Sequence, residues 1–470
     1  MKGIVSRIIS LATLALGCGL TACSPVREYQ RPEVQLPAAY PAPVAPGKEM
    51  AIVPYRKFFT DPDLVSLIDS AVENNHDLLI AIRNIDYARE AYDVSRLGFL
   101  PDANLGGSAS YSRASENSST AMNNQKRSSR SYTAALTVSW EADIWAKLQN
   151  RKKAALAEYL RSADAARAVR TRLVSSVAQG YWNLQMLDSQ LDITRHNIAL
   201  ADTTLTMMRL QYDAGNVTSL AVQQQESQLF SAKLAISKLE AARSAQQNAL
   251  SILAGRMPGS VVKRGKAESS PAVSDSLGAG VPLGLLSNRP DVKAAEESLM
   301  QKHASMGAAK AMLYPSLTVT AQGGLNAIES SRWFSTPGSL FDSVQGGLLQ
   351  PIFRRGELKA GYEQSKIVRD QAELAFRQTL LKAVGEVSDA LVQVEQTGTQ
   401  QRLATQRAAT LRQAAANSRL LFQSGMATWL EVIISESTQL QSELELADVR
   451  RSHLSALADL YRSVGGGWQE

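Results

Sequence analysis

Residues that bind metals or form disulfides are scarce in this 470-residue sequence, which contains two cysteines and four histidines. The histidines are scattered over separate segments without the spacing of a metal site, at His76, His196, His303 and His453. We also find no phosphate-binding glycine loop and no nucleophile elbow. The sequence therefore predicts neither an enzyme nor a protein that holds a cofactor or a metal.

Strong charge of one sign is also missing. The net charge is only +6, and no run of lysine and arginine interleaved with aromatic residues accompanies it. This argues against a nucleic-acid partner. A hydrophobic content of 44% with 20% charged residues is ordinary for a folded protein and excludes wholesale disorder.

The apolar run at the N-terminus is too short for a comfortable membrane span, which needs about 20 residues. It extends from Ile8 to Leu20 after two basic residues, as in a secretory signal. It ends in Leu20-Thr-Ala-Cys23, which resembles the bacterial lipobox, in which the cysteine is diacylated after cleavage. We therefore predict a signal peptide over 1–22 and lipidation of Cys23; an ordinary signal with a chance cysteine is the alternative. Ser24, where an aspartate would suggest inner-membrane retention, favours the outer membrane.

Cleavage before Cys23 would leave a single cysteine, so no internal disulfide is expected. Six prolines from Pro25 to Pro46 forbid a helix and predict an extended tether. A helical pattern then begins near Asp63, resumes after Asn75 and continues towards Pro101.

Proline is absent between Pro101 and Pro258, and again after Pro351. Within the first gap, apolar or small residues recur from 146 to 214 with a mean step of about 3.5, the period of left-handed supercoiling. The stretch from 356 to 422 shows the same recurrence of apolar or small residues. A helix of this length would reach about 100 Å, roughly three bilayer cores, so we expect it to project into an aqueous space. A plain two-stranded coiled coil would show the same period.

Between these helical patterns the period changes to two. Apolar and polar residues alternate over 103–111, 132–140 and 317–325, which is typical of strands with one apolar face. A fourth candidate strand near 340–349 alternates poorly, because Asp342 falls on the expected apolar face. Each strand has about 10 residues, the length of a tilted transmembrane strand. Half-buried soluble hairpins are the alternative.

Four strands cannot close a membrane barrel alone, because the smallest have about eight. Open sheet edges in lipid would leave backbone groups unpaired, at several kcal/mol each. Either the hairpins lie outside the membrane, or several chains share one barrel. Three copies would supply twelve strands.

The order of elements occurs twice in the chain. Leu210-Gln-Tyr-Asp-Ala-Gly215-Asn-Val-Thr218-Ser-Leu220 returns 210 positions later as Leu420-Leu-Phe-Gln-Ser-Gly425-Met-Ala-Thr428-Trp-Leu430. Each copy follows a short helix, a hairpin and a long helix, and precedes a second helix. Such duplication predicts one pseudo-symmetric unit rather than separate domains. Glycine allows the chain to reverse with positive φ, although simple helix capping would use it equally.

Several short motifs, each weak alone, occur together in one order and resemble the TolC/OprM family of outer-membrane efflux channels, in its lipoprotein branch. They are Tyr29-Gln30-Arg31-Pro32, Val281-Pro282-Leu-Gly-Leu-Leu286-Ser-Asn-Arg289-Pro290-Asp291-Val292, Ala295-Glu296, Gly307-Ala-Ala-Lys-Ala311, Tyr314-Pro315-Ser316-Leu317, Pro351-Ile352-Phe353 and Gly465-Gly-Gly467-Trp468. The resemblance implies a mainly α-helical homotrimer with a membrane β part: an α-helical barrel of long coiled-coil helices and a shared twelve-stranded transmembrane β-barrel. It also implies a lipid-anchored protein of the outer membrane that extends into the periplasm.

The resemblance further implies a passive exit duct. Drugs or other small toxic compounds would be delivered by an inner-membrane resistance-nodulation-division (RND) pump through a periplasmic adaptor, also called a membrane fusion protein. The two helix-turn-helix tips are implied to contact that adaptor. Their residues are Asp213, Ala214, Gly215, Asn216, Val217 and Thr218 in the first tip, and Gln423, Ser424, Gly425, Met426, Ala427 and Thr428 in the second. Protein secretion with an ABC exporter is the alternative function, and the lipobox and Arg289-Pro290-Asp291 favour efflux.

One departure from the family concerns the periplasmic aperture, which relatives commonly narrow with acidic residues before the second tip. Between Arg402 and Trp429 this sequence has no aspartate or glutamate and carries three arginines. The candidate aperture residues are therefore Asp202, Asp213, Arg412 and Arg419.

The resulting division of the chain has ten parts. Residues 1–22 are the signal, 23–62 the tether, 63–101 the first short helices, 102–141 the first hairpin, 142–254 the first long helix with its tip and return helix, 255–287 an equatorial linker, 288–314 a short helix, 315–350 the second hairpin, 351–464 the second long helix with its tip and return helix, and 465–470 the tail.

Overall fold

The structure is a computed structural model that describes residues 25–34, 48–49, 53–116, 127–260, 277–278, 284 and 288–469. The expected signal peptide and Cys23 lie outside the described residues. The chain divides into two compact units, which we call the sheet unit and the helix-pair unit. The sheet unit comprises Met1–Pro32, Asp86–Leu160 and Glu296–Leu374, and the helix-pair unit comprises Glu33–Ile85, Arg161–Ala295 and Ala375–Glu470.

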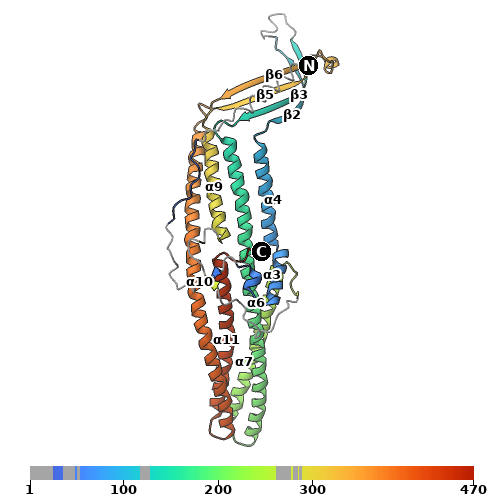
Figure 1. Cartoon of the computed structure of the whole chain (residues 1–470). Coiled ribbons are helices and arrows are strands. Elements are labelled where there is room, and N and C mark those ends of the chain that lie inside the picture. The colour runs from blue at the N-terminus through green and yellow to red at the C-terminus, as the bar shows by residue number, and fades with distance from the viewer. Residues whose placement is uncertain are drawn as a thin grey trace. The chain divides into compact units, whose positions relative to one another are not determined.

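The sheet unit contains one antiparallel sheet of four strands in the order β2-β3-β5-β6 (Figure 1). The strands are β2 (Asp102–Arg113), β3 (Ser128–Ala142), β5 (Ser316–Ala327) and β6 (Leu340–Leu349). β2, β3 and β5 form where the two-residue period predicts them. β6 forms despite its poor alternation, because backbone pairing with β5 runs from Leu340 to Leu349.

The register of the sheet gathers the apolar residues on one face. Directly paired residues of antiparallel strands lie on the same face. One such row crosses all four strands through Ala103, Val138, Ala321 and Val344. Asp342 lies two residues from Val344 and therefore on the same face, as the sequence indicated. The other face is mainly polar or small.

Both outer strands of the sheet lack a second neighbour. β2 pairs only with β3, and β6 pairs only with β5, among the strands in the described part of the chain. The sheet therefore ends in two open edges.

A backbone approach inside the sheet requires glycine at 324, where an added Cβ would lie 2.1 Å from the Ala134 carbonyl oxygen.

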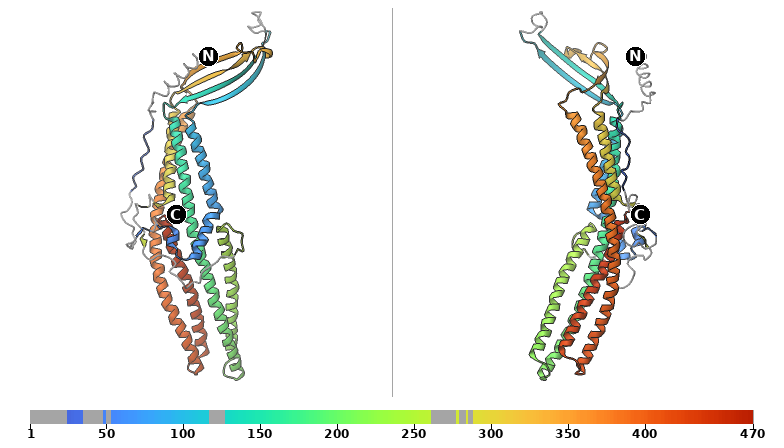
Figure 2. Two further views of the ribbon diagram at one scale, coloured as in Figure 1. Left: turned by 45° about the vertical axis from the view of Figure 1, so that its right-hand side comes forward. Right: turned by 90° about the vertical axis from the view of Figure 1, so that its left-hand side faces the viewer.

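Two helical hairpins, whose long helices begin in the sheet unit, make up most of the helix-pair unit. The first joins α6 (Lys147–Asp213) to α7 (Ser219–Leu253), and the second joins α10 (Glu357–Gln423) to α11 (Trp429–Ser463). α6 and α10 each contain 67 residues, and α7 and α11 each contain 35. The four helices lie side by side where they approach their turns (Figures 1 and 2). The prediction of two very long helices is confirmed.

None of the helices in the described ranges is sufficiently long and apolar to cross a membrane.

The shorter helices are α2 (Tyr55–Phe58), α3 (Pro62–Asn74), α4 (His76–Leu97) and α9 (Pro290–Ala311). A 3₁₀ turn, η3 (Ser330–Arg332), lies between β5 and β6, and β1 (Lys48–Glu49) pairs in parallel with β4 (Leu277–Gly278). The break between α3 and α4 falls at Asn75, as predicted. Its side chain accepts a hydrogen bond from the Leu78 amide and donates one to the Leu253 carbonyl.

Aromatic packing joins α2 to α6 and α11 in the helix-pair unit. Phe58 stacks on Tyr461 with ring centroids 4.0 Å apart, and Phe59 contacts Trp182 at 5.9 Å. All four side chains are almost fully buried. They join residues that are far apart in sequence, and burial of such rings is the largest apolar contribution a residue can make.

Arg289 links three segments of the helix-pair unit. Its guanidinium donates two hydrogen bonds to Asp291, at 3.0 and 2.6 Å, and one each to Glu386 on α10 and the Ser463 carbonyl on α11. Arg289 is 5% exposed. Burial disfavours the charged Asp291 carboxylate, but the hydrogen bonds and charge of Arg289 outweigh burial and lower the pKa of Asp291.

The glycine tail packs beside this cluster. An added Cβ at Gly465, whose φ is +94°, would lie 2.5 Å from the Asn288 carbonyl oxygen, to which the Trp468 indole donates at 3.2 Å. The motifs around Arg289 and Gly465 therefore belong to one packing site.

In the sheet unit, the segment after Cys23 lies along α9. Arg31 forms a two-point ion pair with Glu296 at 2.6 and 2.7 Å, and the Lys310 ammonium donates to the Pro25 carbonyl at 2.8 Å. An added Cβ at Gly307 would meet the Asn150 side chain at 2.9 Å, so glycine permits α9 to approach α6. Two of the motifs found in the sequence thus meet in space.

We predict that Arg289→Met lowers the free energy of unfolding by about 1–3 kcal/mol, because Asp291, Glu386 and the Ser463 carbonyl each lose the hydrogen bonds of one buried guanidinium. The matched control is Arg462→Met, since Arg462 contacts Glu386 at 3.5 Å and is half-exposed. That control is expected to cost less than about 1 kcal/mol. Urea unfolding of the detergent-solubilised protein measures both.

The same pair predicts a pH dependence. Because the pKa of Asp291 is lowered in the folded state, its contribution to stability is present above the ordinary aspartate pKa of about 4. It is lost as the pH falls through the lower folded value. The difference between wild type and Arg289→Met should therefore shrink below about pH 4; a constant difference would contradict the Arg289–Asp291 account.

Candidate functional site at the helical tips

The two hairpins reverse direction with the same backbone geometry. Gly215 and Gly425 have φ of +76° and +73°, and nothing lies within 4 Å of where a Cβ would stand. Their amides donate to the carbonyls of Tyr212 and Phe422, at 2.9 and 3.0 Å. The following amide in each turn donates to the carbonyl five residues back, which completes a Schellman motif. Conformation rather than crowding therefore requires glycine at both turns.

Threonine starts the return helix in both hairpins. The Thr218 and Thr428 hydroxyls each accept from the amide three residues on, at 3.4 Å. Only the second tip has a capping box, because Glu431 reaches back to the Thr428 amide at 2.6 Å. This backbone hydrogen bond, with a second from the Thr428 hydroxyl, lowers the pKa of Glu431.

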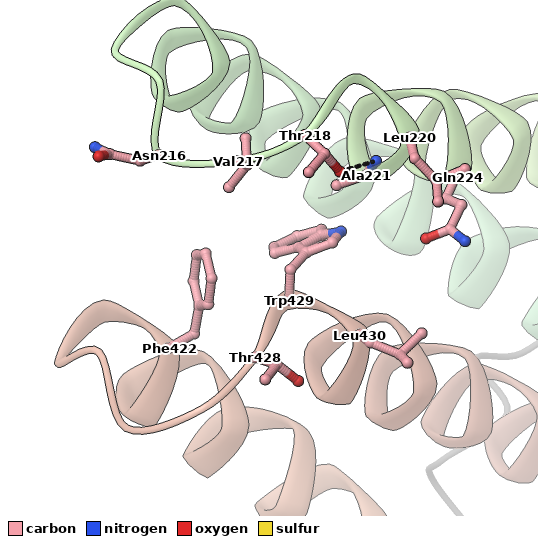
Figure 3. A pocket seen from close by; sticks show the side chains of 10 residues that line it. All are labelled: Asn216, Val217, Thr218, Leu220, Ala221, Gln224, Phe422, Thr428, Trp429 and Leu430. Atoms are coloured by element: carbon pink, nitrogen blue, oxygen red, sulfur yellow. Dashed lines mark hydrogen bonds between the residues drawn. The ribbon is translucent and has the colours of Figure 1, made fainter.

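A groove of about 380 Å³ lies between the two tips (Figure 3). Figure 3 shows the Trp429 indole reaching from the second tip towards the first, with Phe422 beside it. These two rings meet edge to face at 5.2 Å, and Trp429 packs with Met208 and Val432 in a small core. The residues that line the groove are Asn216, Val217, Thr218, Leu220, Ala221, Gln224, Phe422, Thr428, Trp429 and Leu430.

The predicted tip residues lie in these two turns, and the structure brings the two sets together at one groove. Those that line it are Asn216, Val217, Thr218 and Thr428. Gly215, Gly425 and Met426 are exposed beside it. The sequence places both tips over 212–220 and 422–430, so Phe422 and Trp429 fall inside the predicted second tip, but neither is among the expected contact residues. The aromatic residue at 429, where the first copy has Ser219, was a visible signal.

Ion pairs connect α10 to α11 above the second tip. Arg407 pairs with Glu445 at 2.5 Å, Arg412 with Glu443 at 2.9 Å, and Arg419 with Glu436 at 2.7 Å. The arginines that distinguish this segment therefore meet acids of the return helix. These acids were not among the candidate aperture residues, because the sequence pattern of α10 carries no information about its neighbouring helix.

The first hairpin repeats only one of these pairs. Arg209 pairs with Glu226 at 2.6 Å, and both residues lie 210 positions before Arg419 and Glu436. Asp202 stands where the second hairpin has Arg412, so the charge is reversed. Asp202 and Asp213 are exposed on α6.

No cluster of histidine, cysteine or carboxylate side chains suited to a metal ion occurs among the residues that the structure describes. The chemistry offered by the tips is that of a contact surface: exposed backbone turns, an apolar groove and fixed charges.

Two long helical hairpins joined to a small antiparallel sheet define a class of channel-forming membrane protein, and comparison with known proteins gives the family. The model of the family described as outer membrane efflux protein matches residues 67–256 and 282–466. This chain therefore belongs to the outer membrane efflux protein family, as the motifs indicated.

The relatives include the cation efflux system protein CusC of Escherichia coli O6:H1, 29% identical over 98% of this chain and 99% of the relative. The solvent efflux pump outer membrane protein SrpC of Pseudomonas putida is 28% identical over 96% of each chain. The probable outer membrane lipoprotein SilC of Salmonella typhimurium is 28% identical over 99% of each. A crystal structure of a membrane protein from Pseudomonas aeruginosa is 26% identical, with a TM-score of 0.87 over 94% of this chain and all of that one.

The protein is accordingly an outer-membrane efflux channel, and its relatives are transport proteins rather than enzymes. The mainly helical fold with a small sheet agrees with the solved relative.

The ion pairs at the tips should differ in their contribution to local stability. The Glu436 side chain is 10% exposed, whereas that of Glu226 is 35% exposed. We predict that Arg419→Met increases hydrogen exchange at the tip end of α10 and α11 by roughly tenfold, because a buried carboxylate loses its partner. Arg209→Met, the matched control, should change exchange in the first hairpin by less than about threefold. Equal effects in both hairpins would contradict this assignment.

Proposed function

We propose that three copies of this chain form one water-filled duct from the periplasm to the cell exterior. The observation that carries the proposal is the four-stranded sheet with an apolar face and two open edges. Leu105 and Val344, on that face, are 83% and 71% exposed in the single chain. Lipid would cover such a face, but it cannot satisfy the unpaired backbone groups of β2 and β6. Pairing β6 with β2 of the next copy would remove both edges and close twelve strands.

The long helices extend the same duct. At 1.5 Å per residue, α6 and α10 are each about 100 Å long, several times the thickness of a membrane core. The equal lengths of the two hairpins and their matching turns support two copies of one structural unit per chain. Three chains would then supply twelve helices around an α-helical barrel in the periplasm.

The tips are the proposed contact with a periplasmic adaptor, which connects the duct to an inner-membrane RND pump. The groove between Val217 and Trp429 presents apolar side chains beside exposed backbone, and such a surface suits a partner helical hairpin. No bond is made or broken in this function. The relatives of the chain are named for efflux, which favours efflux over protein secretion with an ABC exporter.

The cargo is proposed to be small toxic compounds chosen by the pump. CusC is named for cations and SrpC for solvents, yet both align with nearly the whole of this chain. A duct that tolerates such different cargo would act by shape rather than by binding. If α6 and α10 narrow its periplasmic end, Asp202 and Asp213 supply negative charge there, while the acids of α11 partly neutralise Arg412 and Arg419.

The first test concerns the turn at the second tip. We predict that Gly425→Val strains the turn by about 1–3 kcal/mol, because φ is +73° there. Trimer yield should be unchanged and efflux should fall, since a misaimed tip cannot seal against its partner. Drug susceptibility, trimer yield and cross-linking from position 426 to the adaptor measure the three effects.

Gly361→Val is the matched control, because Gly361 lies within helix α10, has no positive φ and has open space at its Cβ. It should leave efflux and the cross-link intact. Normal efflux of Gly425→Val, with no cross-link from either tip, would mean that the adaptor docks elsewhere.

The second test concerns the lipid anchor. We predict that radiolabelled palmitate labels the wild type and fails to label Cys23→Ser. Trimer assembly should survive the change, because a shared barrel would already hold the protein in lipid. Labelling of Cys23→Ser, or none of the wild type, would refute the anchor at this position.

A further inference from the structure

Two arginines lie on the apolar face of the sheet, at the end where β2 and β3 join. Arg113 pairs with Ser128, and Tyr111 pairs with Arg130. Both arginines are therefore on the face that carries Ala103, and both are exposed. They are diagonal neighbours across the two strands, about 7–8 Å apart at their Cα atoms. An apolar face that ends in two adjacent cations is unusual, because like charges repel.

Aromatic side chains separate these cations from the apolar residues. The Arg130 guanidinium lies over the Tyr111 ring, 5.9 Å from its centroid, beside a hollow of about 350 Å³. Tyr132 packs on Trp333 at 5.5 Å, and Trp333 on the exposed Phe334 at 5.0 Å. Such aromatic girdles mark the level of the lipid headgroups in outer-membrane strands.

The spacing along β3 places Arg130 at one headgroup level of the membrane if Trp140 lies at the other. Trp140 lies on the same face near the opposite end of the strand, and its indole donates to the Phe99 carbonyl at 3.0 Å. Trp140 lies ten positions after Arg130. At about 3.4 Å per residue and a strand tilt of about 40°, this separation covers about 26 Å of membrane thickness, against an apolar band of about 25 Å.

Neighbouring arginines already have acidic partners. Arg127 pairs with Glu116 at 2.8 Å, and Arg332 pairs with Glu329 at 3.1 Å. Arg113 and Arg130 form no ion pair with any residue for which the structure gives a position. An external anion at this level would therefore relieve their mutual repulsion.

We propose that Arg113 and Arg130, with Tyr111, bind a phosphate group of an anionic lipid in the outer leaflet of the outer membrane. The guanidinium fork matches phosphate oxygens in two-point hydrogen bonds, and low water content at the headgroup level strengthens them. The apolar face below the arginines would hold the acyl chains of the same lipid. This inference rests on the proposed insertion of the sheet in the membrane.

The test uses the full-length protein purified in detergent and a fluorescent lipid A that carries both phosphates. We expect Arg113→Gln/Arg130→Gln to bind this lipid at least about tenfold more weakly than wild type, because two charge-assisted contacts are lost. Arg332→Gln is the matched control, since it removes a paired arginine at the same end of the sheet, and should bind like wild type. Arg113→Lys/Arg130→Lys should recover part of the affinity.

Two further probes identify the ligand. Dephosphorylated lipid A should bind wild type no better than it binds the double glutamine variant, and inorganic phosphate should compete only weakly. Equal binding of lipid A by wild type and the double variant would overturn the proposal, as would equal losses in Arg332→Gln. Trimer yield and efflux of the double variant are expected to match wild type. If the proposed membrane duct is wrong, the wild-type protein itself will not insert in the membrane, and this outcome is distinct from a loss of lipid binding in the variant.

Discussion

Unpaired backbone groups at the two edges of one small sheet determine how this protein can exist in a membrane. β2 and β6 each have a neighbour on one side only in the described chain, while the face between them is apolar and exposed. Water could satisfy such edges and lipid could cover such a face, but no single environment does both for an isolated chain. Pairing between copies resolves the conflict. Membership of the outer membrane efflux protein family supplies independent support for a membrane environment.

In the helix-pair unit, long helices with few apolar residues must be held side by side in a fixed register. Buried rings such as Phe58 and Tyr461 do this near the C-terminal end of α11. Towards the tips, where side chains are more exposed, cross-helix ion pairs such as Arg419–Glu436 take over. Arg289 connects the loop before α9 to both α10 and α11. The shape of the tip groove therefore depends on two glycines with positive φ, Gly215 and Gly425. It also depends on charged side chains that pair with each other within one chain.

Much of this arrangement could be predicted from the sequence, because it is periodic. The two-residue alternation located β2, β3 and β5, a poorly alternating candidate near 340–349 proved to be β6, and the 3.5-residue spacing located α6 and α10. The matching glycine segments located both turns. Contacts between distant segments could not be predicted, because a pattern within one helix carries no information about its neighbour. The partners of Arg412 and Arg419 on α11, the meeting of Arg31 with Glu296, and Trp429 in the groove all needed three-dimensional positions.

The most direct test of the central claim is the mass of the folded protein extracted from the outer membrane, measured by native mass spectrometry. We predict a trimer as the only species that is both membrane-inserted and natively folded, because each chain brings four strands and the smallest closed barrels need about eight. Partial dissociation should yield chains that lose their β structure. A stable, membrane-inserted monomer with intact β structure would contradict the shared barrel and, with it, the duct.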